Sequence, residues 1–164
     1  MATKRRSKND YINNAEFLLA MKGYKADVKK AEEEGKPKPQ VPDYIGKCLI
    51  DIANGLASRP NFSNYGFKEE MIGDGILNCL QYIENFDPDK GSNPFAYFTQ
   101  ITWYAFLRKI ADEKKKLYTK MKMMDSSSEM YSGETQVKHS DYSRDYMSKF
   151  ISDYEEAIEK KKLK

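Results

Sequence analysis

The side chains that could do chemistry gather in one stretch of the chain, in three consecutive groups. Residues 69–89 contain six acidic side chains and no basic one. Six of the twelve residues 95–106 are aromatic, and residues 108–122 carry seven cationic side chains against two acidic ones. Carboxylates attract a basic protein partner, exposed rings stack on unpaired bases, and cations hold phosphates. The order indicates a protein partner, exposed bases and a phosphate backbone in turn.

The acidic group is expected on a helix that spans residues 68–85. Its buried stripe is predicted to be Ile72, Ile76, Leu80 and Ile83, with Cys79 beside them. The opposite side carries the predicted protein-binding residues, which are Glu70, Asp74, Asn78 and Gln81. Gly73 and Gly75 each cost about 1 kcal/mol of helix propensity, so we expect a close approach to the helix backbone there.

The aromatic group is expected on a helix that begins after Asn93 and Pro94, a cap and a first-turn proline. At 100° per residue, Phe95, Phe98, Thr102 and Phe106 share one side, with Trp103 and Ile110 at its edge. The predicted nucleic-acid-binding residues are Tyr97, Gln100, Ile101, Tyr104 and Arg108 on the other side, followed by Lys114, Lys115 and Lys116. A core role for Tyr97 and Tyr104 is an equally good interpretation.

The rest of the chain supplies elements that would position these groups. Asn13 and Glu16 form a capping-box pattern for a helix over 14–33, with Ala15, Leu18 and Leu19 as its apolar residues. Residues 35–42 contain three prolines and predict an extended linker. Asp43 is the predicted cap of a helix with the apolar residues Ile45, Cys48, Leu49, Ile52, Ala53 and Leu56. A short ordered loop is expected over 61–65.

After Lys116 we expect the helix to fray, and residues 125–136 are predicted to be a polar linker. A docking helix should follow, with Met147, Phe150, Ile151, Tyr154 and Ile158 on its apolar face. The chain is therefore expected to be all-α, with three parts. These are an N-terminal helix and proline-rich linker (1–42), a helical core (43–118), and a flexible linker with the docking helix (119–164).

Composition argues against several classes of site. With 164 residues, 40% hydrophobic and 32% charged, the chain fits one small domain with appendages. Cys48 and Cys79 fall on apolar stripes and are expected to be core residues. With the single histidine, His139, neither a metal cluster nor a histidine-based triad is expected. The turn over 87–91 lacks the ligand spacing of a calcium loop, since Phe98 stands where the bidentate glutamate belongs.

We therefore expect no cofactor and no enzymatic activity. No apolar run approaches the roughly 20 residues that span a bilayer. Residues 1–10 are basic without an apolar segment, so neither a signal peptide nor a membrane partner is expected.

The stretch 69–110 resembles region 2 of bacterial sigma factors. The matching residues run from Glu70-Met-Ile-Gly-Asp-Gly75 to Asn85-Phe-Asp-Pro-Asp-Lys-Gly91, then Tyr97, Thr99, Ala105, Arg108 and Ile110. The chain is more closely similar to the late-transcription sigma factors of T-even-type bacteriophages. That resemblance adds Asp10-Tyr-Ile-Asn-Asn14, Asn61-Phe-Ser63 and Asn93-Pro94, and covers residues 10 to 118.

The resemblance implies a small helical bundle like sigma region 2, with flexible N- and C-terminal extensions. It implies that Glu70 and Asp74 bind the clamp-helix coiled coil of host core RNA polymerase. It further implies that the aromatic helix captures an opened, AT-rich −10-type promoter element in the cytoplasm of an infected bacterium. Gln100 and Ile101 stand where housekeeping sigma factors carry a tryptophan pair. A late co-activator and the replication sliding clamp are further partners that the family admits, although this chain ends in basic residues rather than the family's acidic clamp-binding tail.

Two other functions stay open at this point. A helical single-stranded-DNA-binding or replication-accessory protein would use the aromatic and basic groups without meeting polymerase. An interaction adaptor would use the acidic helix without binding nucleic acid. Co-purification with core polymerase separates the sigma-factor hypothesis from both.

Overall fold

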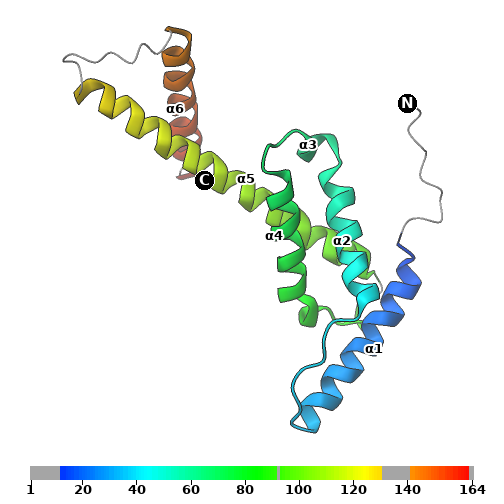
Figure 1. Cartoon of the computed structure of the whole chain (residues 1–164). Helices are drawn as coiled ribbons and strands as arrows, with labels where there is room; N and C mark the ends of the chain where they lie inside the picture. Colours follow the sequence, from blue (N-terminus) through cyan, green and yellow to red (C-terminus); the bar gives the residue numbers. More distant parts are fainter. Residues whose placement is uncertain (1–11, 92, 131–140, 163–164) are drawn as a thin grey trace, which may run out of the picture. The chain divides into compact units, whose positions relative to one another are not determined.

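The computed structural model describes residues 12–91, 93–130 and 141–162. The protein is all-helical, as predicted, and no strand occurs within those ranges. The helices are α1 (Asn14–Glu33), α2 (Asp43–Ala57), α3 (Pro60–Ser63), α4 (Lys68–Gln81), the 3₁₀ helix η1 (Ile83–Asn85), α5 (Pro94–Met130) and α6 (Asp141–Lys162) (Figure 1). They form two compact units, and the division between Lys109 and Ile110 falls within α5.

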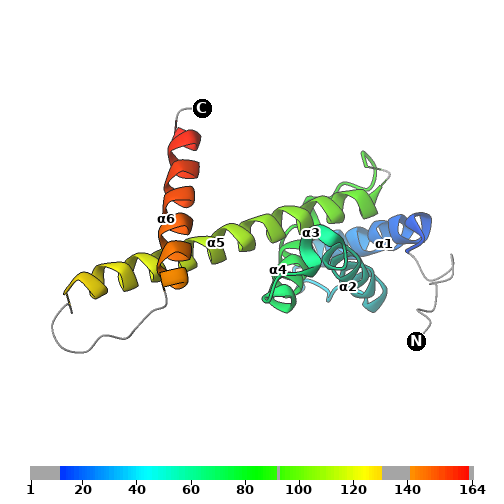
Figure 2. The same ribbon diagram turned by 90° about the horizontal axis from the view of Figure 1, so that it is seen from above.

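Helix α2 forms the centre of the first unit, beside α1, α3 and α4 (Figure 1 and Figure 2). Every apolar residue that its sequence period predicted is buried, and Ala57 is buried as well. Asp43 is the first helical residue rather than the cap, because Pro42 occupies the cap position. A strong 3.6-residue period thus identified the buried face of α2 without knowledge of its neighbours.

Helix α1 has the predicted bounds but a different buried face. The Asn13 side chain accepts a hydrogen bond from the backbone N–H of Ala15 at 3.1 Å. Glu16 does not complete a capping box; its carboxylate accepts a bond from the Tyr44 hydroxyl at 3.4 Å. The buried residues are Phe17, Met21 and Tyr24, whereas Leu19, predicted to be on the apolar face, is 72% exposed.

The spacing of Phe17, Met21 and Tyr24 explains that error. That spacing continues for two turns, and Leu18 beside it is half-buried against the same core as predicted, whereas Leu19 has no apolar residue three or four positions after it. Residues 37–42 then run without helix or strand, and Gly35 takes a positive φ of 63° just beyond the helix.

Helix α4 is rotated relative to the prediction and shorter than expected. Its buried residues are Met71, Ile72, Gly75 and Cys79, while Leu80 is 38% exposed. A Cβ added at Gly75 would lie 2.9 Å from both the Phe106 ring and the Thr102 methyl. The close approach predicted for this helix is therefore confirmed at Gly75. It is wrong for Gly73, which has open space around it.

Helix α5 begins where Asn93 and Pro94 predicted. The Asn93 carboxamide oxygen accepts a bond from the N–H of Ala96 at 2.9 Å, and Asn14 accepts one from Phe95 at 3.2 Å. Phe98, Thr102 and Phe106 are completely buried, as predicted, and Phe95 is half-buried. The rings of Phe17 and Phe98 stack at 5.6 Å, and Phe62 meets Phe106 edge-on at 5.2 Å. These contacts join α1, α3 and α5 in one aromatic core.

Beyond Lys116 the chain does not fray as predicted, because α5 continues to Met130. Residues 125–130, predicted to be linker, are helical, and the rest of the predicted linker lies outside the described residues. In the second unit, α6 has most of the predicted apolar side: Ile151 is buried, and Met147, Phe150 and Tyr154 are half-buried, but Ile158 is 37% exposed. None of the helices in the described ranges has the length and apolar character that crossing a membrane requires.

Candidate functional site

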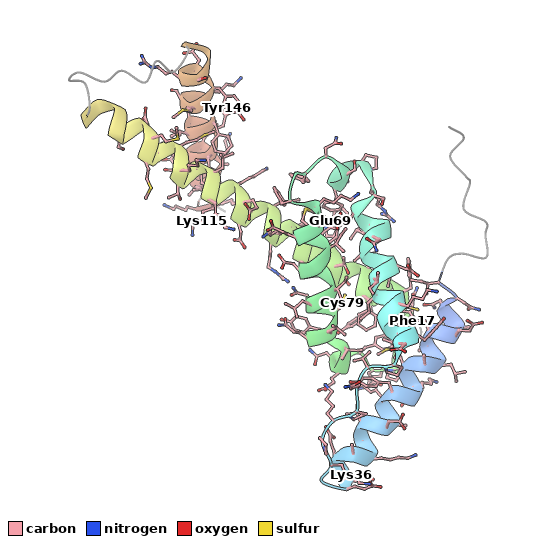
Figure 3. All side chains as sticks on the ribbon, in the orientation of Figure 1. Phe17, Lys36, Glu69, Cys79, Lys115 and Tyr146 are labelled. Atoms are coloured by element: carbon pink, nitrogen blue, oxygen red, sulfur yellow. The ribbon has the colours of Figure 1, made fainter. Side chains whose placement is uncertain are left out.

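The four predicted protein-binding residues lie on one side of α4, as the helical period requires. Glu70 and Gln81 are exposed, and Asp74 and Asn78 are half-buried. Figure 3 shows Glu69 near the start of this helix and Cys79 farther along it. Cys79 is buried, with its sulfur 3.3 Å from the Thr102 hydroxyl. Both cysteines are therefore core residues, as predicted.

This polar side of α4 is joined directly to α5. The Glu70 carboxylate and the Lys109 ammonium lie 2.6 Å apart. An Arg108 Nη donates to the Asn78 side-chain oxygen at 2.6 Å, and the Asn78 amide nitrogen donates to the Asp74 carbonyl at 2.7 Å. The predicted protein surface and the predicted nucleic-acid surface therefore adjoin, which the linear sequence does not indicate.

The two helices run antiparallel, because residues early in α4 meet residues late in this part of α5. Glu70 meets Lys109, Gly75 meets Thr102 and Phe106, and the Tyr82 carbonyl just after α4 meets Tyr97. Gly75 permits this close packing, since any larger side chain would fill the space between the helices.

Two leucines add apolar area to the exposed side of α4. Leu77 is 54% exposed and Leu80, predicted to be a core residue, is 38% exposed. Leu77 lies seven residues after Glu70 and three after Asp74, so all three share one helical face. That spacing could have identified Leu77 from the sequence. The face combines carboxylates with one leucine, which suits an amphipathic basic helix better than a purely acidic face would.

Tyr97 is half-buried rather than exposed. Its ring lies 5.1 Å from Phe86 and meets Phe98 edge-on, also at 5.1 Å. Its hydroxyl donates to the Tyr82 carbonyl at 3.3 Å, and burial raises the pKa of the phenol. Ile101 is half-buried against the same core. Of the two roles that the sequence left open for Tyr97, the structure favours the core role, because the segment after α4 covers its ring. For Ile101, which packs against the core, the prediction of an exposed face is wrong.

The exposed part of the predicted nucleic-acid face is a line of Gln100, Tyr104 and Arg108, spaced four residues apart. Tyr104 is 52% exposed, so its ring is available to a ligand. Trp103 is half-buried and packs edge-on against Phe62 at 4.9 Å. The sequence left a core role and an exposed role open for both tyrosines. The structure favours the core role for Tyr97 and the exposed role for Tyr104.

The three predicted phosphate-binding lysines lie in the second unit. Lys114, Lys115 and Lys116 are all exposed, and Lys116 forms an ion pair of 2.7 Å with Glu113. Lys115 and Lys116 also border a shallow hollow of 480 Å³ with Thr119, Lys120, Met123 and Met124. An exposed pair such as Lys116–Glu113 contributes at most about 1 kcal/mol, so it leaves Lys116 able to bind another anion.

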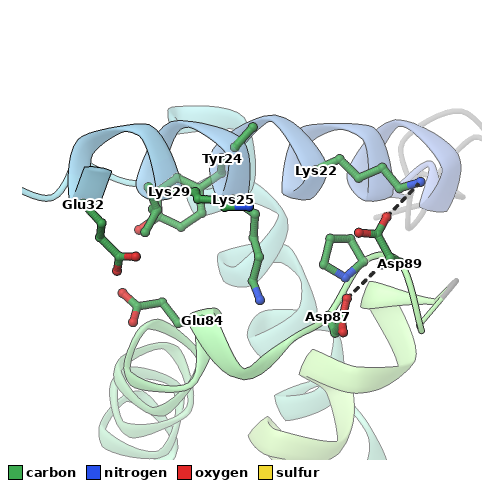
Figure 4. Close-up of a pocket in the computed structure, with 11 residues that line it drawn as sticks. Lys22, Tyr24, Lys25, Lys29, Glu32, Glu84, Asp87 and Asp89 are labelled. Carbon is green, nitrogen blue, oxygen red and sulfur yellow. Dashed lines mark hydrogen bonds and ion pairs between the residues drawn. The ribbon is translucent and has the colours of Figure 1, made fainter. Parts of the chain in front are cut away.

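A separate hollow of 680 Å³ lies between α1 and the turn before α5, away from all predicted residues (Figure 4). Lysines of α1 line one wall together with Glu32, carboxylates before α5 line the other, and Lys22 lies 3.9 Å from Asp89. The predicted turn is present: the Gly91 N–H bonds to the Asp87 carbonyl at 2.8 Å. The Asp89 N–H bonds to the Asp87 carboxylate and lowers its pKa. The mixture of charges gives this hollow no marked preference for one sign of ligand.

Within the described ranges, no three His, Cys, Asp or Glu side chains gather in a way that could hold a metal ion. No protein-family model matches this chain, and none of the curated proteins is significantly similar to it.

Proposed function

We propose that this protein is a non-enzymatic promoter-specificity subunit that acts like sigma factor region 2 in late phage transcription. Helix α4 binds the clamp-helix coiled coil of host core RNA polymerase, in the cytoplasm of the infected bacterium. The exposed face of α5 binds the opened strand of an AT-rich −10-type promoter. The observation that best supports the proposal is the Asn78–Arg108 hydrogen bond, which joins the polar side of α4 to the exposed face of α5.

The polymerase surface is the side of α4 that carries Glu70, Asp74, Leu77 and Gln81. Its carboxylates complement a basic helix and set the orientation of docking, while the exposed leucine supplies apolar contact area. Lys109 of this chain already pairs with the Glu70 carboxylate, which a basic residue of the partner would also bind. The Glu70 side chain nevertheless remains 65% exposed. The Lys109 side chain is only 15% exposed, so it is the exposed Glu70 carboxylate that a basic partner can reach.

The DNA surface is narrower than the sequence predicted. Tyr104 stacks on an unpaired base for about 1–3 kcal/mol, and Arg108 and Gln100 one turn away contact the backbone or base edges. Since no tryptophan pair stands at Gln100 and Ile101, this protein captures a strand that polymerase or a co-activator helps to open. Lys114, Lys115 and Lys116 add sequence-independent phosphate contacts.

The test is a transcription reaction with purified host core polymerase and late phage DNA. We expect a defined start site with the protein present and none with polymerase alone. Glu70→Lys combined with Asp74→Lys should abolish co-purification with core polymerase while far-UV helicity stays near that of the parent protein. The matched control is Glu32→Lys with Glu33→Lys, on exposed positions of α1, which should leave polymerase binding unchanged.

Normal polymerase affinity in the α4 double variant would contradict the assignment of this surface. The second candidate is a single-stranded-DNA-binding accessory protein, favoured by the exposure of Tyr104 and the three lysines. It predicts tight binding of single strands and no polymerase in a pull-down from infected cells.

A further inference from the structure

The contact between α6 and the second half of α5 has an unusual chemistry. The Tyr118 and Tyr154 rings stack at 4.6 Å with an interplanar angle of 22°, and Phe150 stacks behind Tyr154 at 6.3 Å and 17°. The Glu155 carboxylate accepts two bonds through one oxygen. The Tyr118 hydroxyl donates at 2.7 Å and the Lys122 ammonium at 2.6 Å.

On α5, the side chains of Tyr118 and Lys122 lie one turn apart and close together. The Lys122 ammonium lies 5.9 Å from the centre of the Tyr118 ring, so a planar group on the ring would have a cation at its edge. A ring for stacking with a cation for the backbone is the combination by which proteins bind single-stranded nucleic acid.

On α6, the neighbouring residues Tyr154 and Glu155 complement them: Tyr154 stacks on Tyr118, and Glu155 pairs with Lys122. The Tyr154 ring occupies the position that a base would take on Tyr118, and the Glu155 carboxylate supplies the anion that a phosphate would supply to Lys122. The two bonds from Lys122 and Tyr118 lower the pKa of Glu155. The contact thus sets a ring on a ring and an anion beside a cation, which are the two kinds of contact that a stacked nucleotide would make.

Helix α6 is held by contacts that a ligand can replace. Ile151 is its only buried residue in the described part of the helix. The Lys122 and Glu155 side chains are 50% and 45% exposed, so water screens their ion pair. A segment with few buried apolar contacts opens locally at small cost in free energy.

We propose that Tyr118 and Lys122 form a binding site for one stacked nucleotide of single-stranded DNA, and that α6 covers this site with Tyr154 and Glu155. A strand that binds here displaces the two α6 side chains and takes over their contacts. This site shares with the proposed function the binding of exposed bases, but it requires neither polymerase nor Tyr104.

The experiment measures the affinity of the full chain for a fluorescent oligothymidylate by anisotropy. The double variant Tyr154→Ala/Glu155→Gln uncovers the site, so affinity should rise by about fivefold or more, because a larger fraction of molecules is competent to bind. Adding Tyr118→Ala and Lys122→Gln should remove the gain. A duplex of the same length should show no gain, since its bases are already stacked.

A matched control changes the same residue types elsewhere on α6. Tyr146→Ala/Glu156→Gln replaces an exposed tyrosine and a glutamate that pairs with Lys160 within α6, so oligothymidylate affinity should not change. The single variant Glu155→Gln keeps the stack of Tyr118 on Tyr154. Its affinity for oligothymidylate should rise by less than that of the double variant.

Unchanged or weaker binding by both Glu155→Gln and the double variant, with helicity retained, would overturn the proposal. A gain that survives Tyr118→Ala/Lys122→Gln would overturn it too, because the strand would then bind elsewhere. The failure of polymerase-dependent initiation affects only the proposed function, since these measurements contain no polymerase.

Discussion

Two tyrosines, seven residues apart on α5, differ in what surrounds them. Tyr97 packs on Phe86 and Phe98 and donates its hydroxyl to the Tyr82 carbonyl, whereas Tyr104 is 52% exposed. On a helical wheel both belong to the same polar side, so the sequence treats them alike. Their surroundings assign Tyr97 to the core and leave the Tyr104 ring open to a ligand.

This difference gives a prediction at the residue scale. Tyr97→Ala should lower the free energy of unfolding by about 1–3 kcal/mol, because it removes a half-buried ring from the aromatic core. Tyr104→Ala should change it by less than about 0.5 kcal/mol. It should instead weaken the binding of single-stranded DNA by about 5- to 100-fold if one base stacks there. Urea unfolding followed by circular dichroism and an anisotropy titration measure the two effects.

The reverse result, with Tyr97→Ala stable and Tyr104→Ala unfolded, would mean that the faces of α5 are assigned the wrong way round. Tyr97→Phe is the matched control for the hydroxyl. It keeps the ring contacts and loses only the bond to the Tyr82 carbonyl, so it should cost about 1 kcal/mol or less.

At the scale of elements, the crossing of α4 and α5 depends on one glycine. Cys79, Met71 and Ile72 are buried on the same side as Gly75, and Leu77 and Leu80 face outward as a result. A helix rotates so that its smallest residue lies at the point of closest approach, because the backbones then pack tightly. This rotation also brings the polar side of α4 to the Arg108 and Lys109 side of α5.

Substitutions at two glycines of α4 test whether α4 and α5 approach most closely at Gly75. Gly75→Ala should destabilise the protein by about 1–3 kcal/mol, since its methyl group would lie 2.9 Å from the buried Phe106 and Thr102. Gly73→Ala should stabilise it by up to about 1 kcal/mol, because its site is open and alanine favours helix. Thermal or urea unfolding measures both. Equal effects of the same sign would show that the helices do not meet at Gly75.

At the scale of the whole molecule, acidic and basic side chains are concentrated in successive segments of the chain, and the two segments meet where Lys109 pairs with Glu70. Residues 108–122 carry seven cations, and the net charge of the protein is only +3. A weak net charge with segregated signs suits a protein that binds a nucleic acid through one segment and a basic partner through another.

Replacing Lys114, Lys115 and Lys116 with glutamine should weaken binding to DNA of every sequence alike. It should also flatten the dependence of affinity on salt, by about 0.7–0.9 log unit for each phosphate that the variant no longer binds. Titrations at several salt concentrations measure the slope. Lys29→Gln/Lys30→Gln on exposed positions of α1 is the matched control. A slope that stays the same in the triple variant would place these lysines on solvent or on a protein.

Local sequence determined much of the fold. The bounds of α1, the buried face of α2 and the start of α5 follow from features within about ten residues. These are the Asn13 cap, the apolar period of α2, and the Asn93–Pro94 pair. Such features act through backbone hydrogen bonds and through the side on which a helix is apolar, so they need no information about distant segments.

Only the tertiary structure decided which surfaces remain open. The sequence could not decide whether Tyr97 is a core residue, and it placed Leu80 in the core, whereas Tyr97 packs against the core and Leu80 is 38% exposed. Nor could it show that Arg108 bonds to Asn78, or that Tyr154 stacks on Tyr118 across 36 residues. Periodicity defines the faces of one helix, but the neighbour that covers each face is selected by the fit of side chains far apart in the chain. Here the absence of a side chain at Gly75 made that selection for α4 and α5.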